Sequence, residues 1–189
     1  MRPVGIEEIK NIAEYELERK TLRPRIMALK ERRRVAVGPH LTFLFENHAT
    51  VLYQIQEMMR IERLVEPQAI RHEVDTYNEL IPLPGQLSAT LLIEYVTPDE
   101  RNVKLRELLG LENHVWLAVA DLPPGQARFD TRQIATTRIS AVQYVKFPLT
   151  ADGRARWRQG VRIVVDHPRY AAEALLTPDQ IAELESDFQ

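Results

Sequence analysis

The chain has 189 residues, a net charge of −2, an apolar fraction of 44% and a charged fraction of 28%. This length suits one domain with a substantial core, and the balanced composition excludes a disordered or fibrous protein. The absence of cysteine excludes disulfides, thiolate nucleophiles and cysteine-bound zinc or iron–sulfur clusters. No apolar run reaches the roughly 18 residues that a membrane-spanning helix needs. The segment MRPVGIEEIKNIAEYELERK carries acids where a signal peptide is apolar, so we expect a cytoplasmic protein without a membrane partner.

The first half of the chain alternates between helical and extended patterns. Apolar residues at helical spacing mark the helices, and Pro24 suits the first position of the second helix because its missing N–H is not needed there. Gly38-Pro39 interrupts a segment that otherwise has the pattern of a buried strand. We therefore predict helices over 6–20, 24–32, 47–65 and 67–78, and extended structure over 35–46.

Two capping patterns are the clearest local signals of the second half. Each pattern begins with a capping Thr, followed by a proline in the first helical position. Two residues later comes an acid or amide side chain that can reach back to the backbone N–H of the Thr. The two patterns are Thr97-Pro98-Asp99-Glu100 and Thr177-Pro178-Asp179-Gln180. We predict helices over 97–109, 130–137, 151–159 and 177–188. We predict strands over 88–95, 114–120, 139–149 and 161–165.

These elements predict a single α+β domain over 1–189. A mixed sheet of about five strands would be covered by helices mainly on one face. The two-helix connection between the first two long strands leaves those strands free to run parallel. The amino-terminal helical segment, about 1–34, would pack on this core. Its basic end and the acidic carboxy-terminal segment could face each other, or each could meet a partner.

Glu62 is the first candidate for chemistry. On a helical wheel it lies within about 20° of the centre of the apolar stripe between Val51 and Val65. A carboxylate there is either desolvated, as a general acid or base requires, or held in a structural ion pair, and the ion pair is the commoner case. Tyr77 is the second catalytic candidate. A small enzyme or metal-binding protein with a pocket near Glu62 is therefore the first alternative function.

His40, Glu46 and His48 are the candidate metal ligands. They share one face if the strand stays regular past Asn47, and two imidazoles with a carboxylate suit a divalent metal. Asn47 is better placed to end the strand, which disfavours the metal site. The sequence has no P-loop, dinucleotide fingerprint or nucleophile elbow, so the cofactor stays unassigned.

Arg32, Arg33 and Arg34 end the basic run RPRIMALKERRR. Three consecutive arginines offer forked donors to an anion. Aromatic residues are not interleaved with them and the net charge is −2, which disfavours nucleic acid. A solvated, partly paired face is the simpler interpretation. Anion or nucleic-acid binding through Arg25–Arg34 is the second alternative function.

A series of segments resembles an uncharacterised bacterial family, domain of unknown function 3501. They are LKERRRVAVGPH, FEN, QIQEMMRIER, YNELIP and ATLLIEY in that order, with VDHPRY near the end. The resemblance is dense over 29–95 and implies no established activity or catalytic residue. It does imply a redox or oxidative-stress context, with a redox protein as partner. Together with the missing motifs, it favours a non-catalytic accessory or binding domain in the cytoplasm, acting as a homodimer.

Overall fold

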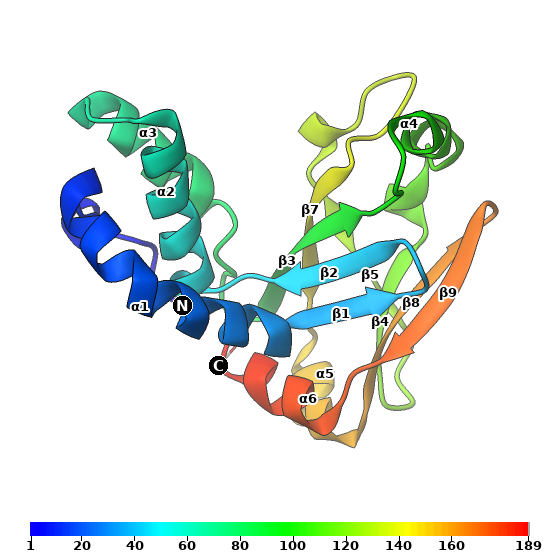
Figure 1. The fold of residues 1–189 in the computed structure, drawn as a ribbon. Coiled ribbons are helices and arrows are strands. Elements are labelled where there is room, and N and C mark those ends of the chain that lie inside the picture. The colour runs from blue at the N-terminus through cyan, green and yellow to red at the C-terminus, as the bar shows by residue number, and fades with distance from the viewer. Residues whose placement is uncertain (189) are drawn as a thin grey trace.

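Two antiparallel sheets and a layer of helices make up the fold of the computed structural model, which describes residues 1–188 (Figure 1). The strands are β1 (Arg34–Val37), β2 (Leu41–Phe45), β3 (Gln86–Ile93), β4 (Val115–Val119), β5 (Gly125–Gln126), β6 (Arg128–Phe129), β7 (Val142–Pro148), β8 (Val161–His167) and β9 (Tyr170–Leu175). The first sheet has the order β1-β2-β3-β7-β6, and the second has the order β5-β4-β8-β9. The predicted α+β class and the single domain are confirmed.

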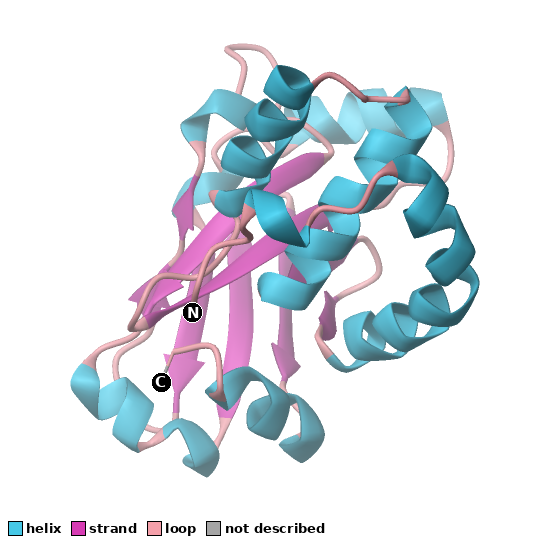
Figure 2. Ribbon diagram, turned by 90° about the vertical axis from the view of Figure 1, so that its left-hand side faces the viewer, coloured by secondary structure: helices cyan, strands magenta, loops and turns pink. Residues whose placement is uncertain are grey.

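Residues 1–188 also contain six α-helices and four short 3-10 helices. The α-helices are α1 (Ile12–Arg32), α2 (His48–Glu62), α3 (Pro67–Asn78), α4 (Pro98–Glu107), α5 (Ala151–Ala155) and α6 (Pro178–Glu185). The 3-10 helices are η1 (Ile6–Glu8), η2 (Leu111–Asn113), η3 (Thr131–Gln133) and η4 (Trp157–Gln159). Helices α1, α2 and α3 form a layer at one end of the molecule, and Figure 2 views the molecule from that side. None of the helices within residues 1–188 combines the length and the apolar character needed to cross a bilayer.

The expected single mixed sheet is wrong. Every strand pair is antiparallel, and the strands divide between two sheets. The connection between β2 and β3 holds two helices as predicted. However, α2 and α3 form an antiparallel hairpin that returns the chain to the end of β2 from which it left, so β3 runs back beside β2 (Figure 1). Strand β9 was not predicted, because its alanine-rich sequence lacks the β-branched residues typical of strands.

Helix α1 is continuous, where the sequence predicted separate helices over 6–20 and 24–32. Pro24 lies inside it. An internal proline removes one backbone hydrogen bond and costs about 3 kcal/mol. Burial of Tyr15 on one side of Pro24 and of Ile26 on the other holds both halves in one helix. The helix begins only at Ile12, because the Asn11 side chain accepts the Glu14 N–H and caps it.

The hydrophobic residues form two separate clusters. The larger cluster lies between the sheets, where Phe43 and Phe45 pack on Phe147 with ring centroids 5.9 and 5.8 Å apart. The smaller cluster lies within the helical layer and includes Ile55 and Met59 of α2. The first sheet therefore directs its apolar face to the main core and its other face towards the helical layer.

Candidate functional site

The face of the first sheet that turns towards α2 and α3 is polar. Strand alternation sends apolar side chains to the core and their neighbours to this face. Strand pairing sets Ser88 opposite Lys146 and Thr90 opposite Tyr144. Glu46, directly after β2, joins them through its backbone N–H, which donates to the Ser88 carbonyl over 2.8 Å. This face therefore brings a carboxylate, an amine, a phenol and hydroxyls together.

Glu46 links the sheet to α2. Its side chain is only 7% exposed, and its carboxylate accepts hydrogen bonds from the hydroxyls of Thr90 (2.7 Å) and Thr50. Thr50 lies in the first turn of α2, where its hydroxyl also accepts the Asn47 N–H in the capping box. A buried carboxylate needs such donors, since an unpaired one is strongly disfavoured. The Glu46 carboxylate therefore anchors α2 on β3.

Lys146 links the sheet to the end of α3. Its Nζ donates to the Glu79 carbonyl over 2.6 Å and to the Ser88 hydroxyl over 2.7 Å. Glu79 is the C-cap of α3, a position where a cation is favourable to the helix dipole. Burial lowers the pKa of Lys146 to about 8, although the negative charges of Glu46 and Glu79 oppose the shift. Lys146 is thus a half-buried amine whose pKa lies about one unit above neutral pH.

The titration of Lys146 can be measured directly. In protein with ¹³C-methylated lysines, we expect the Lys146 resonance to titrate near pH 8 and Lys104 to titrate above the ordinary lysine value of about 10.4. The hydrogen bond from Lys104 to Glu107 raises the Lys104 pKa, which makes it an internal reference. A Lys146→Arg variant assigns the resonance. A Lys146 midpoint equal to that of Lys104 would contradict the burial argument.

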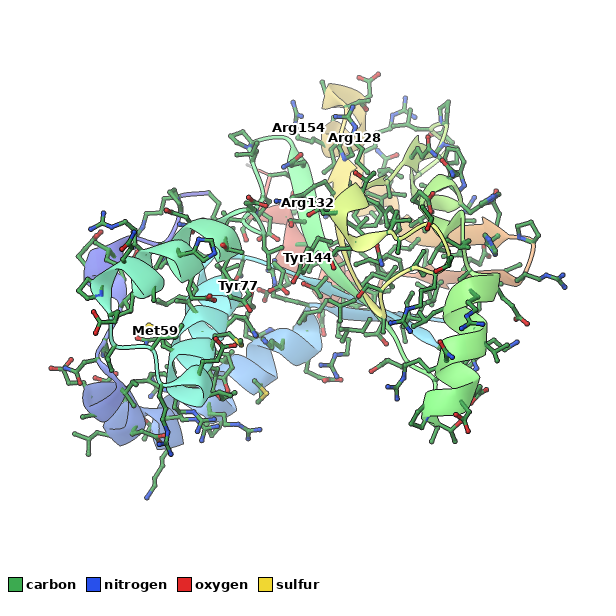
Figure 3. The ribbon with its side chains drawn as sticks, turned by 90° about the horizontal axis from the view of Figure 1, so that it is seen from above. Met59, Tyr77, Arg128, Arg132, Tyr144 and Arg154 are labelled. Atoms are coloured by element: carbon green, nitrogen blue, oxygen red, sulfur yellow. The ribbon has the colours of Figure 1, made fainter. Side chains whose placement is uncertain are left out.

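A cleft of about 550 Å³ lies between this polar face and α3. We call it the tyrosine cleft, after Tyr77 of α3 and Tyr144 of β7. Figure 3 shows these two labelled side chains close together where the helical layer meets the first sheet. Burial raises the pKa of both phenols, so both stay protonated at neutral pH. Met58 and Phe129 add apolar lining.

The cations of the tyrosine cleft are unevenly neutralised. Arg132 pairs with Asp130 over 2.7 Å and with Glu79. Arg128 lies directly opposite Lys146 across the strand pair, and like charges in that position are destabilising. Within residues 1–188 the Arg128 side chain forms no hydrogen bond or ion pair. Glu73 on α3 is the remaining acid of the lining, so the cleft has a cationic β6–β7 wall and an acidic α3 wall.

Glu62 does not lie on a buried stripe, and that prediction is wrong. It is the last residue of α2 and is exposed. The buried stripe ends at Met59, and Arg63 then ends the helix in the left-handed conformation with φ 54°. Val65 therefore falls outside the helix and is 68% exposed. Of the two predicted catalytic residues, Tyr77 lines the cleft and Glu62 does not.

The structure does not bring His40, Glu46 and His48 together. The His40 ring stacks on Tyr95 with centroids 4.1 Å apart. His48 opens α2 and contacts the Glu8 carboxylate over 3.0 Å. Asn47 does end the strand, so the shared strand face on which the metal prediction depended is not formed. Within residues 1–188, no group of three or more His, Asp or Glu side chains is arranged to hold a metal ion.

The basic run meets the acidic carboxy-terminal segment, one of the two arrangements that the sequence left open. Arg33 is fully buried, pairs with Glu183 (3.2 Å) and Asp187, and also donates to two backbone carbonyls at the end of β2. Arg32 pairs with Glu183 over 3.1 Å. Arg34 is exposed. Two of the three predicted anion ligands are therefore engaged with carboxylates.

Sequence reasoning missed Tyr144, Lys146 and Arg128. The signal was present for the first two, since in VQYVKFP they alternate with the core residues Val145 and Phe147. That alternation indicates a polar sheet face. What it cannot indicate is the helical layer across from it, because α3 is distant in sequence.

Comparison with known proteins places the chain among proteins of undetermined activity. The model of the family described as protein of unknown function (DUF3501) matches residues 3–188. The crystal structure of a novel protein of unknown function from Burkholderia pseudomallei K96243 is similar, with 33% sequence identity, both chains covered in full and a TM-score of 0.93. No curated protein matches the sequence. As its segments predicted, the chain belongs to the DUF3501 family of unknown function.

Proposed function

We propose that this protein binds a small ligand in the tyrosine cleft and performs no chemistry on it. The ligand class is a planar molecule that carries an anionic group. The observation that carries the proposal is the combination of two cleft-lining tyrosines, Tyr77 and Tyr144, with the closely spaced cations Arg128 and Lys146. The sequence favours a non-catalytic binding domain, and this proposal assigns its binding site to the tyrosine cleft.

The size and lining of the tyrosine cleft support this ligand class. Its volume of about 550 Å³ is within the usual range for small-molecule sites, roughly 300–1,000 Å³. Aromatic side chains favour offset stacking on a planar ring. An anionic group beside Arg128 would relieve its repulsion with Lys146. Tyr77, Tyr144 and Arg128 would thus hold one ligand directly. Lys146 contributes its charge alone, because its Nζ already donates to three acceptors.

An enzyme is the alternative that the perturbed groups raise. A buried carboxylate and a lysine of lowered pKa beside a cleft are typical of active sites, but also of structural networks. The bonds that Glu46 and Lys146 form are those that attach α2 and α3 to the sheet. The structural role accounts for both residues, so we favour binding over catalysis.

The dye anilinonaphthalene sulfonate, which joins aromatic rings to a sulfonate, tests the proposal. We expect the folded protein to enhance its fluorescence with saturable binding. Tyr77→Ala and Tyr144→Ala should each weaken binding about tenfold, a loss of about 1.4 kcal/mol, because each removes one aromatic wall. Circular dichroism would verify that both variants stay folded.

Trp116→Ala is the matched control. Trp116 lies on β4 of the second sheet and is not part of the cleft, so its loss should leave dye affinity unchanged. Equal weakening in all three variants would place the dye elsewhere and refute the cleft. Absence of saturable enhancement in the unmodified protein would refute the proposed ligand class.

We further propose that the protein works in the cytoplasm as a homo-oligomer. The absence of cysteine is compatible with a reducing compartment. Leu17 of α1 and Ile61 of α2 are 82% and 61% exposed, and large exposed apolar side chains are common where copies associate. Sedimentation equilibrium tests the oligomer, and a monomer at all concentrations would exclude it. The redox context and redox partner stay predictions of the family resemblance.

A further inference from the structure

A second cavity, of about 520 Å³, lies beyond Arg132 between α4 and the segment 132–141. We call it the arginine pocket. Its charged and polar lining residues are Arg101, Asn102, Arg132, Gln133, Arg138 and Ser140. No aspartate or glutamate is among the described residues that line it, in contrast to the tyrosine cleft. The arginine pocket is therefore positively charged.

Two of the three guanidinium groups have no carboxylate partner within residues 1–188. Arg101 donates through Nε and Nη2 to the Tyr95 carbonyl, over 3.2 and 3.1 Å, which fixes its position and leaves Nη1 free of these bonds. Arg138 donates through Nη1 to the Asn102 side-chain oxygen over 3.3 Å. Its Nε and Nη2 are not used in that bond. Both arginines thus keep donors for another acceptor.

The backbone holds the two arginines near each other. The Ile139 N–H donates to the carbonyl of Leu105 over 3.1 Å, which attaches the segment that carries Arg138 to α4. Asn102, next to Arg101, is the residue that Arg138 contacts. Arg132 completes the set from η3, although it also pairs with Asp130. The acids in the first turn of α4 do not line the pocket.

We propose that the arginine pocket binds phosphate, as the free ion or as a phosphate ester. Guanidinium groups form paired, charge-assisted hydrogen bonds to phosphate oxygens. A phosphate carries about 1.5 to 2 negative charges at neutral pH, so it neutralises neighbouring guanidiniums better than a carboxylate does. No acid is among the described lining residues, and the nearby carboxylates of Asp130 and Glu79 are already paired with Arg132. This inference does not depend on a ligand in the tyrosine cleft.

Isothermal titration calorimetry of the full chain with inorganic phosphate, at fixed ionic strength, tests the inference. We expect a Kd below about 1 mM for the unmodified protein. Arg138→Gln should weaken binding about tenfold, because it removes one guanidinium. Arg138 is exposed, so its replacement leaves the fold intact. Arg101→Gln should have a similar effect, with thermal melting to verify its fold, because it also loses the bonds to the Tyr95 carbonyl.

Arg106→Gln is the matched control, since Arg106 is an exposed arginine of α4 outside the pocket. It removes the same charge and should leave phosphate affinity unchanged. Equal weakening by Arg106→Gln would indicate non-specific attraction and overturn the inference. The same conclusion would follow if inorganic phosphate gave no binding heat up to about 10 mM.

Phenyl phosphate distinguishes the two sources of the anion. The arginine pocket and the tyrosine cleft share Arg132 and Gln133, so an ester could direct its ring towards Tyr144. Tighter binding of phenyl phosphate than of inorganic phosphate, weakened by both Arg138→Gln and Tyr144→Ala, would assign the pocket to an ester. Equal affinities, both weakened by Arg138→Gln, would assign it to free phosphate. Both results support a phosphate site.

Discussion

Replacement of Arg33 by methionine is expected to reduce the free energy of unfolding by about 3–5 kcal/mol, the range for breaking a buried ion pair by removing one partner. Arg33 is fully buried and pairs with Glu183 and Asp187. Burial raises the pKa of Asp187, and Arg33 opposes that rise. Without Arg33, Asp187 would have to be buried without its cation or become protonated. Urea denaturation at neutral pH measures the loss.

Arg32→Met is the control for this prediction. Arg32 contacts the same Glu183, but its side chain is 54% exposed, so the loss should stay below about 1 kcal/mol. The double variant Arg33→Met/Asp187→Leu should recover much of the stability, because it removes both charges of the buried pair. Equal losses for Arg32→Met and Arg33→Met would show that the buried pair contributes no more than a surface pair.

Trp157→Ala should destabilise the protein by about 3–5 kcal/mol, the usual cost of a large-to-small change at a buried aromatic residue. Trp157 is fully buried in η4, and its ring packs edge-on to Phe188 with centroids 5.0 Å apart. Its indole N–H donates to the Ile181 carbonyl over 2.9 Å. The substitution therefore opens a cavity and leaves a buried carbonyl of α6 without its donor. Thermal and chemical denaturation measure the effect.

The chain offers a matched control in its other tryptophan, Trp116. It is only partly buried, so Trp116→Ala should cost about 1 kcal/mol or less. The destabilisation by Trp157→Phe should fall between those by Trp157→Ala and Trp116→Ala, since phenylalanine keeps an aromatic ring but lacks the indole N–H. In each single variant the remaining tryptophan reports unfolding by fluorescence. Equal stability of Trp157→Ala and Trp116→Ala would show that the packing of α6 does not depend on Trp157.

The parts of the fold that local chemistry determines were predictable from sequence. The Thr97 and Thr177 side chains cap α4 and α6 as expected, because a cap needs only the following three residues. Asn47 ends β2 and opens α2 for the same reason. The α+β class follows from such local elements. Each of these features depends on residues that are close together in the sequence.

The features that depend on distant residues were not predictable in the same way. The division into two sheets depends on which strands pair, and no residue of β3 indicates that β2 lies antiparallel to it. Pro24 stays inside α1 because Tyr15 and Ile26 are buried by other elements. A helical wheel places Glu62 correctly only if the helix continues, and α2 ends there.

The candidate site was also predictable only in part, because its residues come from distant parts of the sequence. Tyr77 was a catalytic candidate beside Glu62, whereas Arg128 belongs to a two-residue strand with no periodicity to detect. Lys146 acquires its lowered pKa from burial among α3, β3 and β7. The arginine pocket combines α4 with the segment 132–141, which follows it by roughly 30 residues in the sequence. Single-sequence patterns cannot detect such assemblies.

The separation of the apolar residues into two clusters has a consequence for how the tyrosine cleft adapts. Between the clusters, the helical layer meets the first sheet through the hydrogen bonds of Glu46 and Lys146, the ion pair between Arg132 and Glu79, and the packing of Tyr144 against the smaller cluster. Water can replace polar contacts of this kind at low cost, whereas it cannot enter an apolar seam without opening a cavity. The width of the cleft can therefore fluctuate at its polar contacts while the main core stays dry, and the packing of Tyr144 on the smaller cluster is the apolar contact that must yield when a thicker guest enters.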